Sequence, residues 1–291
     1  MLPRSFADHH QRSTCTSGQT VRGFWHGCQL GAYQLLCLKS FVDFGHTVEL
    51  FVYDRGISVP SWIERKDANE VLPAEHIMVY QREWWGKGSP SLHSNIFRYA
   101  LLHKLGGWWI DLDVLLLRKD LPLGDDFYAK DYQNLVSTAA LKLPCGHPLL
   151  ADAIERSKRV SEPSAEWGQT GPNLMTKLVA EHGLTGRINP THVLSPLDYH
   201  EIAAVFDPER NEQVRDRCRE AAFIHLFNQL CSAAGVPRDA GPPVGSFIAQ
   251  KFTEHDPGVK FTYRIQFADL SRWIQNFLGH QYYENLYRTM R

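Results

Sequence analysis

The sequence predicts an α/β protein with a mostly parallel central sheet, helices on the sheet's faces and further helices towards the C-terminus. A strand pattern at 21–27, a helical pattern at 30–46 and a β-branched, aromatic strand pattern at 47–54 follow one another closely. This is the order of a βαβ unit, which implies parallel strands. The chain has 291 residues, of which 43% are hydrophobic and 22% charged, so it can bury a sizeable core.

The remaining elements of the first half follow from local signals. The helical spacing of 30–46 reaches Gly45, which stands where a helix C-cap would lie. A third strand is expected at 76–81. The clearest helix is 89–105, with Ser89 as a plausible N-cap residue, and two glycines directly after it are expected to end it.

The second half adds strands and several helices. We expect strands at 108–118, 134–143 and 221–227, and helices at 147–160, at 171–183 and from Leu270 onward. The segment 236–246 is rich in proline and glycine and is expected to be an ordered surface loop. We interpret residues 20–291 as a single domain and residues 1–19 as a flexible N-terminal arm.

Composition excludes some classes of function. The formal net charge is -1, whereas a general nucleic-acid binder would carry a basic excess, so no nucleic-acid partner is expected. The six cysteines form no C-x-x-C pair and no zinc spacing, so we expect free, mostly buried thiols in a reducing compartment. Without a signal-peptide pattern or a transmembrane segment, a cytoplasmic protein is expected, free or peripheral at the inner face of the membrane.

Two aspartates stand one residue apart in the apolar run KLGGWWIDLDVLLLR, residues 104–118. In a continuous strand, Asp111 and Asp113 would point to the same side and Leu112 into the core. Two carboxylates this close repel unless one is protonated or a cation lies between them. Mg²⁺ or Mn²⁺ suits such oxygen ligands. The alternative interpretation is that the pair merely turns into solvent at a strand end.

The preceding helix carries polar residues on one face. Arg98 lies four residues after Ser94 and three after Asn95, so the three residues share that face. The glycine pair would bring this face next to the aspartates. Arg98 could then offset their charge or contact a ligand, and a purely structural salt bridge is the alternative.

The stretch SNIFRYALLHKLGGWWIDLDV resembles a signature of D-x-D sugar transferases, S-[DN]-x-x-R-Y-x-x-L-x-x-x-G-G-x-[YW]-x-D-x-D. These are the α-mannosyl- and α-galactosyltransferase-like proteins, which include the glucosylating clostridial toxins. The resemblance extends over about residues 20–255, through FWHGCQLGAYQLLCLKSFVDFGHTVELFVYD, GQTGPNLMTKLV and IHLFNQL. It implies a GT-A fold, which is Rossmann-like, with added C-terminal helices.

The resemblance also implies roles for individual residues. Asp111 would contact the ribose or sugar of a nucleotide-sugar donor, and Asp113 would bind the metal. Arg98 would meet Asp111 and the donor sugar, and Trp25 would stack on the uracil, with plain core packing as its alternative. His225 would be a late metal ligand suited to Mn²⁺, and the alternative is a structural strand histidine.

Further donor contacts are implied for Ser94, Asn95, Asn228 and Ser246. Many relatives have aspartate at the position of Asn95, which leaves the donor sugar open. The start of the helix at Pro172 would line the acceptor side. Sugar-stacking surfaces could come from Trp84, Trp85, Trp108, Trp109 and Trp167, with at most one of the adjacent pair 108–109 facing the site.

We therefore expect a metal-dependent glycosyltransferase that moves a sugar, most simply from a UDP-linked donor, to an acceptor hydroxyl with retention. The acceptor would be a glycan, a lipid-linked species or a small molecule, as in the synthesis of surface polysaccharides. A nucleotide-sugar-binding pseudo-enzyme is the alternative. A haloacid-dehalogenase-type phosphatase is disfavoured, because Leu115 occupies the position of the threonine in D-x-D-x-T.

Overall fold

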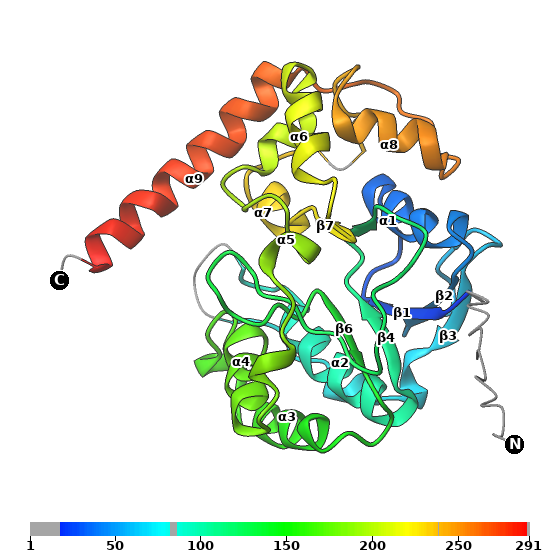
Figure 1. Ribbon diagram of the computed structural model, residues 1–291, viewed down its shortest axis with the longest axis vertical. Coiled ribbons are helices and arrows are strands. Elements are labelled where there is room, and N and C mark those ends of the chain that lie inside the picture. Colours follow the sequence, from blue (N-terminus) through cyan, green and yellow to red (C-terminus); the bar gives the residue numbers. More distant parts are fainter. Residues whose placement is uncertain (1–17, 82–85, 238, 290–291) are drawn as a thin grey trace, which may run out of the picture.

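The computed structural model describes residues 18–81, 86–237 and 239–289, and the predicted arm 1–19 lies mostly outside them. The protein is α/β with a mostly parallel sheet, as predicted (Figure 1). The main sheet has the order β3-β2-β1-β4-β6, with only the last pairing antiparallel. Its strands are β1 (Thr20–Trp25), β2 (Thr47–Val52), β3 (Glu64–Asp67), β4 (Gly107–Ile110) and β6 (Ala140–Leu143). A separate antiparallel pair joins β5 (Val114–Leu116) to β7 (Phe223–His225).

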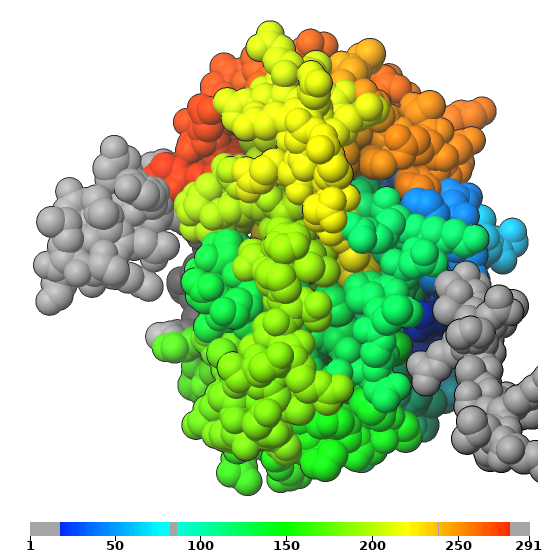
Figure 2. All heavy atoms as spheres, in the orientation of Figure 1, coloured from blue at the N-terminus to red at the C-terminus, as the bar shows by residue number. Residues whose placement is uncertain are grey.

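The helices cover both faces of the main sheet and extend past its end. The first three long ones are α1 (Ala32–Asp43), α2 (Ser91–Leu105) and α3 (Pro148–Lys158). They are followed by α4 (Pro172–Glu181), α5 (Thr191–Leu194), α6 (Asn211–Arg217), α7 (Asn228–Ala233), α8 (Phe247–His255) and α9 (Phe267–Thr289). Figure 2 shows the segments from α6 to α9, yellow to red, gathered at one end of the molecule.

Two hydrophobic clusters cover the two faces of the main sheet. Apolar residues of α1 pack with alternate residues of β1, β2 and β4 on one face, and the α2, α3 and α4 residues pack on the other. Trp108 and Trp109 alternate between these clusters, and each is 1% exposed. A third cluster joins β5 and β7 to α6, α8 and α9. The carboxyl ends of the main sheet therefore face this C-terminal part.

The first βαβ unit agrees with the sequence prediction because its signals are local. The α1 helix ends at Asp43, and Gly45 follows with φ +88°, where an added Cβ would meet no atom within 4 Å. The α2 helix ends at Leu105, and Gly106 follows with φ +63°. Here an added Cβ would lie 2.5 Å from the backbone nitrogen of Cys145, so a glycine is required.

Three strand predictions are wrong. The segment 76–81 forms no strand, since a 3-10 turn at Ala74–His76 is followed by irregular backbone. The third strand is β3, whose sequence ERKD lacks an apolar pattern because it lies half-exposed at the sheet edge. The expected strand 134–143 shortens to β6.

The third error concerns 108–118, which is two strands in different sheets rather than one. The chain pairs with β1 as β4, leaves the main sheet after Ile110 and joins β7 as β5. An unbroken apolar run cannot reveal this break, because both strands are buried on both sides.

The described cysteines form no disulfide bond with one another, but their burial differs from the prediction. Cys37, Cys218 and Cys231 are buried. Cys28 and Cys145 are exposed because each lies in a turn rather than on a packed element face. Cys15 lies outside the described residues. The segment 236–246 is a loop in its described part, with one isolated bridge from Gly241 to Arg264.

Candidate active site

The two aspartates occupy the break between β4 and β5, so they are not on one strand as predicted. The backbone N–H of Asp111 donates to the carbonyl of Ala139, the residue before β6 (2.6 Å). The backbone N–H of Leu226, just after β7, donates to the carbonyl of Asp113 (2.8 Å). Leu112 between them is 7% exposed and packs in the core, as expected. Asp111 is thus held by the main sheet and Asp113 by the second sheet.

Asp111 accepts hydrogen bonds from two buried side chains. Its Oδ1 receives Arg98 Nη2 at 2.6 Å and Trp109 Nε1 at 2.7 Å. Arg98 is 3% exposed, lies over the Trp109 ring at 4.9 Å and donates from Nη1 to Asn95 Oδ1 (2.6 Å). Asn95 in turn donates to Thr170 (3.2 Å). Burial raises the pKa of Asp111, although the Arg98 guanidinium acts in the opposite direction.

Asp113 has a different set of partners, all from the second half of the chain. Its Oδ2 lies 3.3 Å from His225 Nε2 and accepts the backbone N–H of Asn228 at 2.9 Å. Burial opposes ionisation, but the imidazole and the backbone donor outweigh it and lower the pKa of Asp113. Burial likewise disfavours the imidazolium, yet Asp113 raises the pKa of His225. Each group of the pair therefore favours the charged form of the other.

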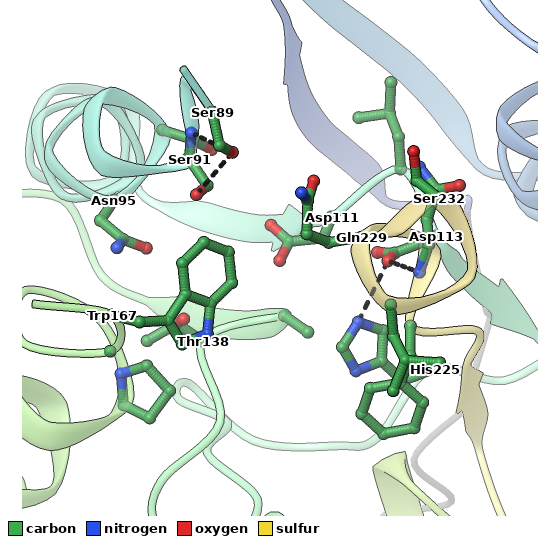
Figure 3. A pocket seen from close by; sticks show the side chains of 18 of the residues that line it. Ser89, Ser91, Asn95, Asp111, Asp113, Thr138, Trp167, His225, Gln229 and Ser232 are labelled. Atoms are coloured by element: carbon green, nitrogen blue, oxygen red, sulfur yellow. Dashed lines mark hydrogen bonds and ion pairs between the residues drawn. The ribbon is translucent and has the colours of Figure 1, made fainter. Parts of the chain in front are cut away.

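These residues line one cleft of ≈ 750 Å³ (Figure 3). In Figure 3, Asn95 and Trp167 lie on one side of Asp111, and Asp113 with His225 on the other. The cleft brings together eight of the nine residues predicted for the site: Trp25, Ser94, Asn95, Arg98, Asp111, Asp113, His225 and Asn228. Its volume is in the range of small-molecule and cofactor sites.

Ser246 is the exception. It is fully buried at the N-cap of α8, where its hydroxyl accepts from the N–H of Ala249 and donates to the carbonyl of Pro243. It does not line the cleft. Its expected contact with a donor does not fit this position, because a helix-capping hydroxyl is already satisfied.

The tryptophans divide by burial. Trp108 and Trp109 are both buried, and neither lines the cleft. Trp167 lines it and is 41% exposed, and Pro172 at the start of α4 lies nearby as a lining residue. Trp25 lines the cleft, but it also packs against the core and donates to the carbonyl of Gln29 (3.0 Å). Trp84 and Trp85 lie outside the described residues.

Sequence reasoning missed other lining residues. Asp131, Tyr132 and Gln133 form a tight turn after β5, and Tyr199 lies in the loop after α5. They belong to no motif and to no periodic element. The only signal was the polar, aromatic composition of two loops that follow elements of the α/β core.

The side chains of the site provide only some of the ligands that a divalent cation needs. Among residues 18–81, 86–237 and 239–289, no three His, Cys, Asp or Glu side chains form a cluster that could hold a metal. Asp113 and His225 provide one carboxylate oxygen and one imidazole nitrogen 3.3 Å apart. This pair fits a cation that takes its other ligands from phosphate oxygens and water, and the imidazole favours Mn²⁺ over Mg²⁺.

Solved structures that are similar to the chain include three glycosyltransferases. The PaToxG glycosyltransferase is 12% identical, with a TM-score of 0.41 over 58% of this chain and 72% of that one. The bifunctional glycosyltransferase WbbM is 11% identical, with a TM-score of 0.48 over 89% of this chain, which spans only 52% of WbbM. The glycosyltransferase domain of the YGT toxin is 10% identical, with a TM-score of 0.43 over 90% and 99% of the two chains.

No protein-family model matches the chain, and no curated protein matches it. In the part of the chain that the structure describes, no helix has the length and apolar character needed to cross a bilayer.

Proposed function

We propose that this protein is a glycosyltransferase that transfers a sugar from a UDP-linked donor to an acceptor hydroxyl, assisted by Mn²⁺ or Mg²⁺. The observation that carries the proposal is the pair of aspartates at the sheet break. One is paired with a buried arginine and the other with a histidine, at the base of a cleft of ≈ 750 Å³. With the cation bound, such a pair suits a ligand that has both a polar sugar and a negatively charged diphosphate.

Each carboxylate would act on a different part of the donor. Arg98 and Trp109 fix Asp111 through its Oδ1, so Oδ2, which no other described residue binds, can accept hydroxyls of the sugar or ribose. Ser94 and Asn95 lie on the same wall of the cleft and can hydrogen-bond the sugar. Trp25 would stack on the base, which is typically worth about 1–3 kcal/mol.

Asp113 and His225 would hold the cation, with Asn228 fixing the Asp113 carboxylate through its backbone N–H. When bound, the cation supplies Lewis-acid stabilisation of the departing diphosphate. His225 must give up its proton to act as a ligand. Its partner Asp113 orients the imidazole ring, and the negative charge of the Asp113 carboxylate offsets the positive charge of the cation.

The reaction breaks the bond between the anomeric carbon and the diphosphate oxygen, and forms one from that carbon to the acceptor oxygen. We propose that the acceptor attacks from the face that the diphosphate leaves, which retains the configuration. The acceptor hydroxyl gives its proton to the leaving phosphate oxygen, so UDP departs as the second product. The proposal includes a cytoplasmic location, free or at the membrane surface, and a role in glycan or surface-polysaccharide synthesis.

Calorimetry tests the proposal. The purified protein would be titrated with UDP-glucose, UDP-galactose, UDP-N-acetylglucosamine and GDP-mannose, with and without Mn²⁺. We expect metal-dependent binding of one donor, lost in Asp113→Ala and kept in the control Asp125→Ala, whose exposed carboxylate lies outside the cleft. If the folded wild-type protein binds none of these donors, the proposal fails.

Release of free sugar from the bound donor separates an enzyme from the alternative, a nucleotide-sugar-binding pseudo-enzyme. Slow hydrolysis of the donor, with water in place of the acceptor, is expected from the wild-type protein. Tight binding without any turnover would favour the pseudo-enzyme.

A further inference from the structure

An aromatic wall lies beside the Asp113–His225 pair. The Phe227 ring lies 4.3 Å from the His225 ring, and Tyr132 and Tyr199 lie 6.0 and 6.4 Å from Phe227. The two tyrosine rings are 4.5 Å apart. All four residues line the cleft. The two tyrosines come from loops that provide none of the residues proposed to bind the donor.

Several hydrogen bonds hold the turn that carries Tyr132. Asp131 Oδ1 accepts the backbone N–H groups of Gln133 (2.8 Å) and Leu135 (3.0 Å), and its own N–H donates to the carbonyl of Leu135 (2.7 Å). Asn134 has φ +61°, a conformation that asparagine tolerates in turns. Thr191, the first residue of α5, donates from Oγ1 to the carbonyl of Asp131 (3.2 Å) and so connects the turn to that helix. The Asp131 carboxylate is thereby fixed before any ligand binds.

This part of the cleft has hydrogen-bonding capacity that the described residues leave unused. Asp131 lines the cleft, and both bonds to its carboxylate go to Oδ1, which leaves Oδ2 free. The hydroxyls of Tyr132 and Tyr199 make no hydrogen bond with any described residue. Fixed acceptors and donors next to half-buried aromatic rings are what an amphipathic ligand requires.

The charges restrict the class of ligand. Among the described lining residues, the side chains that can carry positive charge are His26, Lys87, Arg98 and His225. Arg98 is paired with Asp111 and His225 with Asp113, while the wall itself contributes the Asp131 carboxylate. An anionic group on the wall would meet a negative charge with no cation in the same turn. A neutral ligand therefore suits it best.

We propose that Asp131, Tyr132 and Tyr199 form the acceptor subsite and that its occupant is a neutral sugar ring, the terminal residue of a glycan or glycoside. One face of such a ring carries C–H bonds, whose partial positive charge favours contact with the face of a tyrosine ring. Its edge carries hydroxyls, which the free oxygen of Asp131 and the two phenols can bind. This inference rests on the proposed function, because it names the acceptor for the same cleft.

The test compares transfer with hydrolysis in the whole chain. The donor that binds best would be incubated with methyl glycosides of glucose, galactose, mannose and N-acetylglucosamine, and with a serine- and threonine-rich peptide as a non-sugar acceptor. Free sugar and glycosylated product would be quantified together. We expect the wild-type protein to glycosylate at least one methyl glycoside and to leave the peptide unmodified.

The variants Asp131→Asn and Tyr199→Ala isolate the subsite. Asparagine keeps the oxygen that receives the two backbone N–H groups, so the turn is preserved while the charge is lost. We expect both variants to lower the ratio of transfer to hydrolysis at least tenfold, through a higher KM for the glycoside. The controls Asp125→Asn and Tyr263→Ala alter an exposed aspartate and a 48% exposed tyrosine outside the cleft, and they should leave the ratio unchanged.

The two proposals fail in different ways. Donor hydrolysis without transfer to any glycoside, or transfer to the peptide alone, would overturn the neutral-sugar acceptor and leave the proposed function standing. Transfer whose ratio to hydrolysis is the same in both variants as in the controls would overturn the assignment of the subsite. If the wild-type protein neither binds nor hydrolyses any donor, both proposals are overturned.

Discussion

Replacement of Arg98 by methionine tests whether the buried ion pair organises the site. Methionine keeps an unbranched apolar stem of similar length but removes the guanidinium. The variant loses the bond to Asp111 Oδ1 (2.6 Å), the bond to Asn95 Oδ1 (2.6 Å) and the contact with the Trp109 ring. Asp111 would then lose the guanidinium that offsets its burial, and Trp109 Nε1 would remain as its side-chain donor among the described residues.

The expected magnitude follows from the burial of the two partners. Removing one member of a buried ion pair typically costs about 3–5 kcal/mol. Arg98 is 3% exposed, but the Asp111 side chain is 28% exposed, so water screens part of the cost. We therefore expect the free energy of unfolding to fall by about 2–3 kcal/mol. The control Arg156→Met breaks a pair with Glu181 whose side chains are 35% and 38% exposed, so it should lower the free energy of unfolding far less than Arg98→Met.

Urea denaturation followed by tryptophan fluorescence measures both variants. The double variant Arg98→Met, Asp111→Asn also removes the carboxylate that Arg98 pairs with. Its free energy of unfolding should therefore be higher, by about 1 kcal/mol or more, than the sum of the two single changes predicts. The reasoning is refuted if Arg98→Met costs no more than Arg156→Met, or if the two changes at the site are simply additive.

The remaining predictions concern stability. Ser246→Ala removes the N-cap of α8 and should cost about 1 kcal/mol in chemical denaturation, while calorimetry should show unchanged donor binding. Gly106→Ala should lower Tm more than Gly45→Ala, because both have positive φ but only Gly106 also has a close backbone neighbour, at Cys145. Burial lowers the pKa of His93 to about 4, so the folded state excludes a proton that the unfolded chain binds below its ordinary pKa of about 6.5. The stability contributed by neutral His93 is therefore present above pH 6.5 and lost as the pH falls towards 4, and His93→Gln should flatten that part of a denaturation series against pH.

The sequence was sufficient for the βαβ core, since its signals lie within each element. The apolar spacing of α1, the glycines after α1 and α2 and the β-branched content of β2 are all local. The edge strand β3 was missed because its side chains are half in water and need no apolar pattern. The break after Ile110 was missed because the partner of β5 is β7, and no local pattern encodes a pairing across so much chain.

The same distinction applies to the site. Arg98, Asp111 and Asp113 were predicted from one short motif and His225 from a resemblance of its segment, and all four line the cleft. The structure adds contacts that no motif could give, such as the tie between Asn95 and Thr170. The wall residues Asp131 and Tyr199 come from separate loops, so only tertiary structure places them together.

The division of the two aspartates between two sheets has a consequence for how the protein is made. Asp113 and its backbone donor Asn228 are 115 residues apart, and β5 has no partner until β7 has left the ribosome. Until then the nascent chain carries an unpaired apolar strand edge beside an uncompensated carboxylate, a state prone to aggregation. The candidate site is therefore assembled late in synthesis. Ribosome stalling before residue 223 should yield a chain that has its first βαβ unit and depends on chaperones, whereas stalling late enough for α7 to have left the ribosome should not.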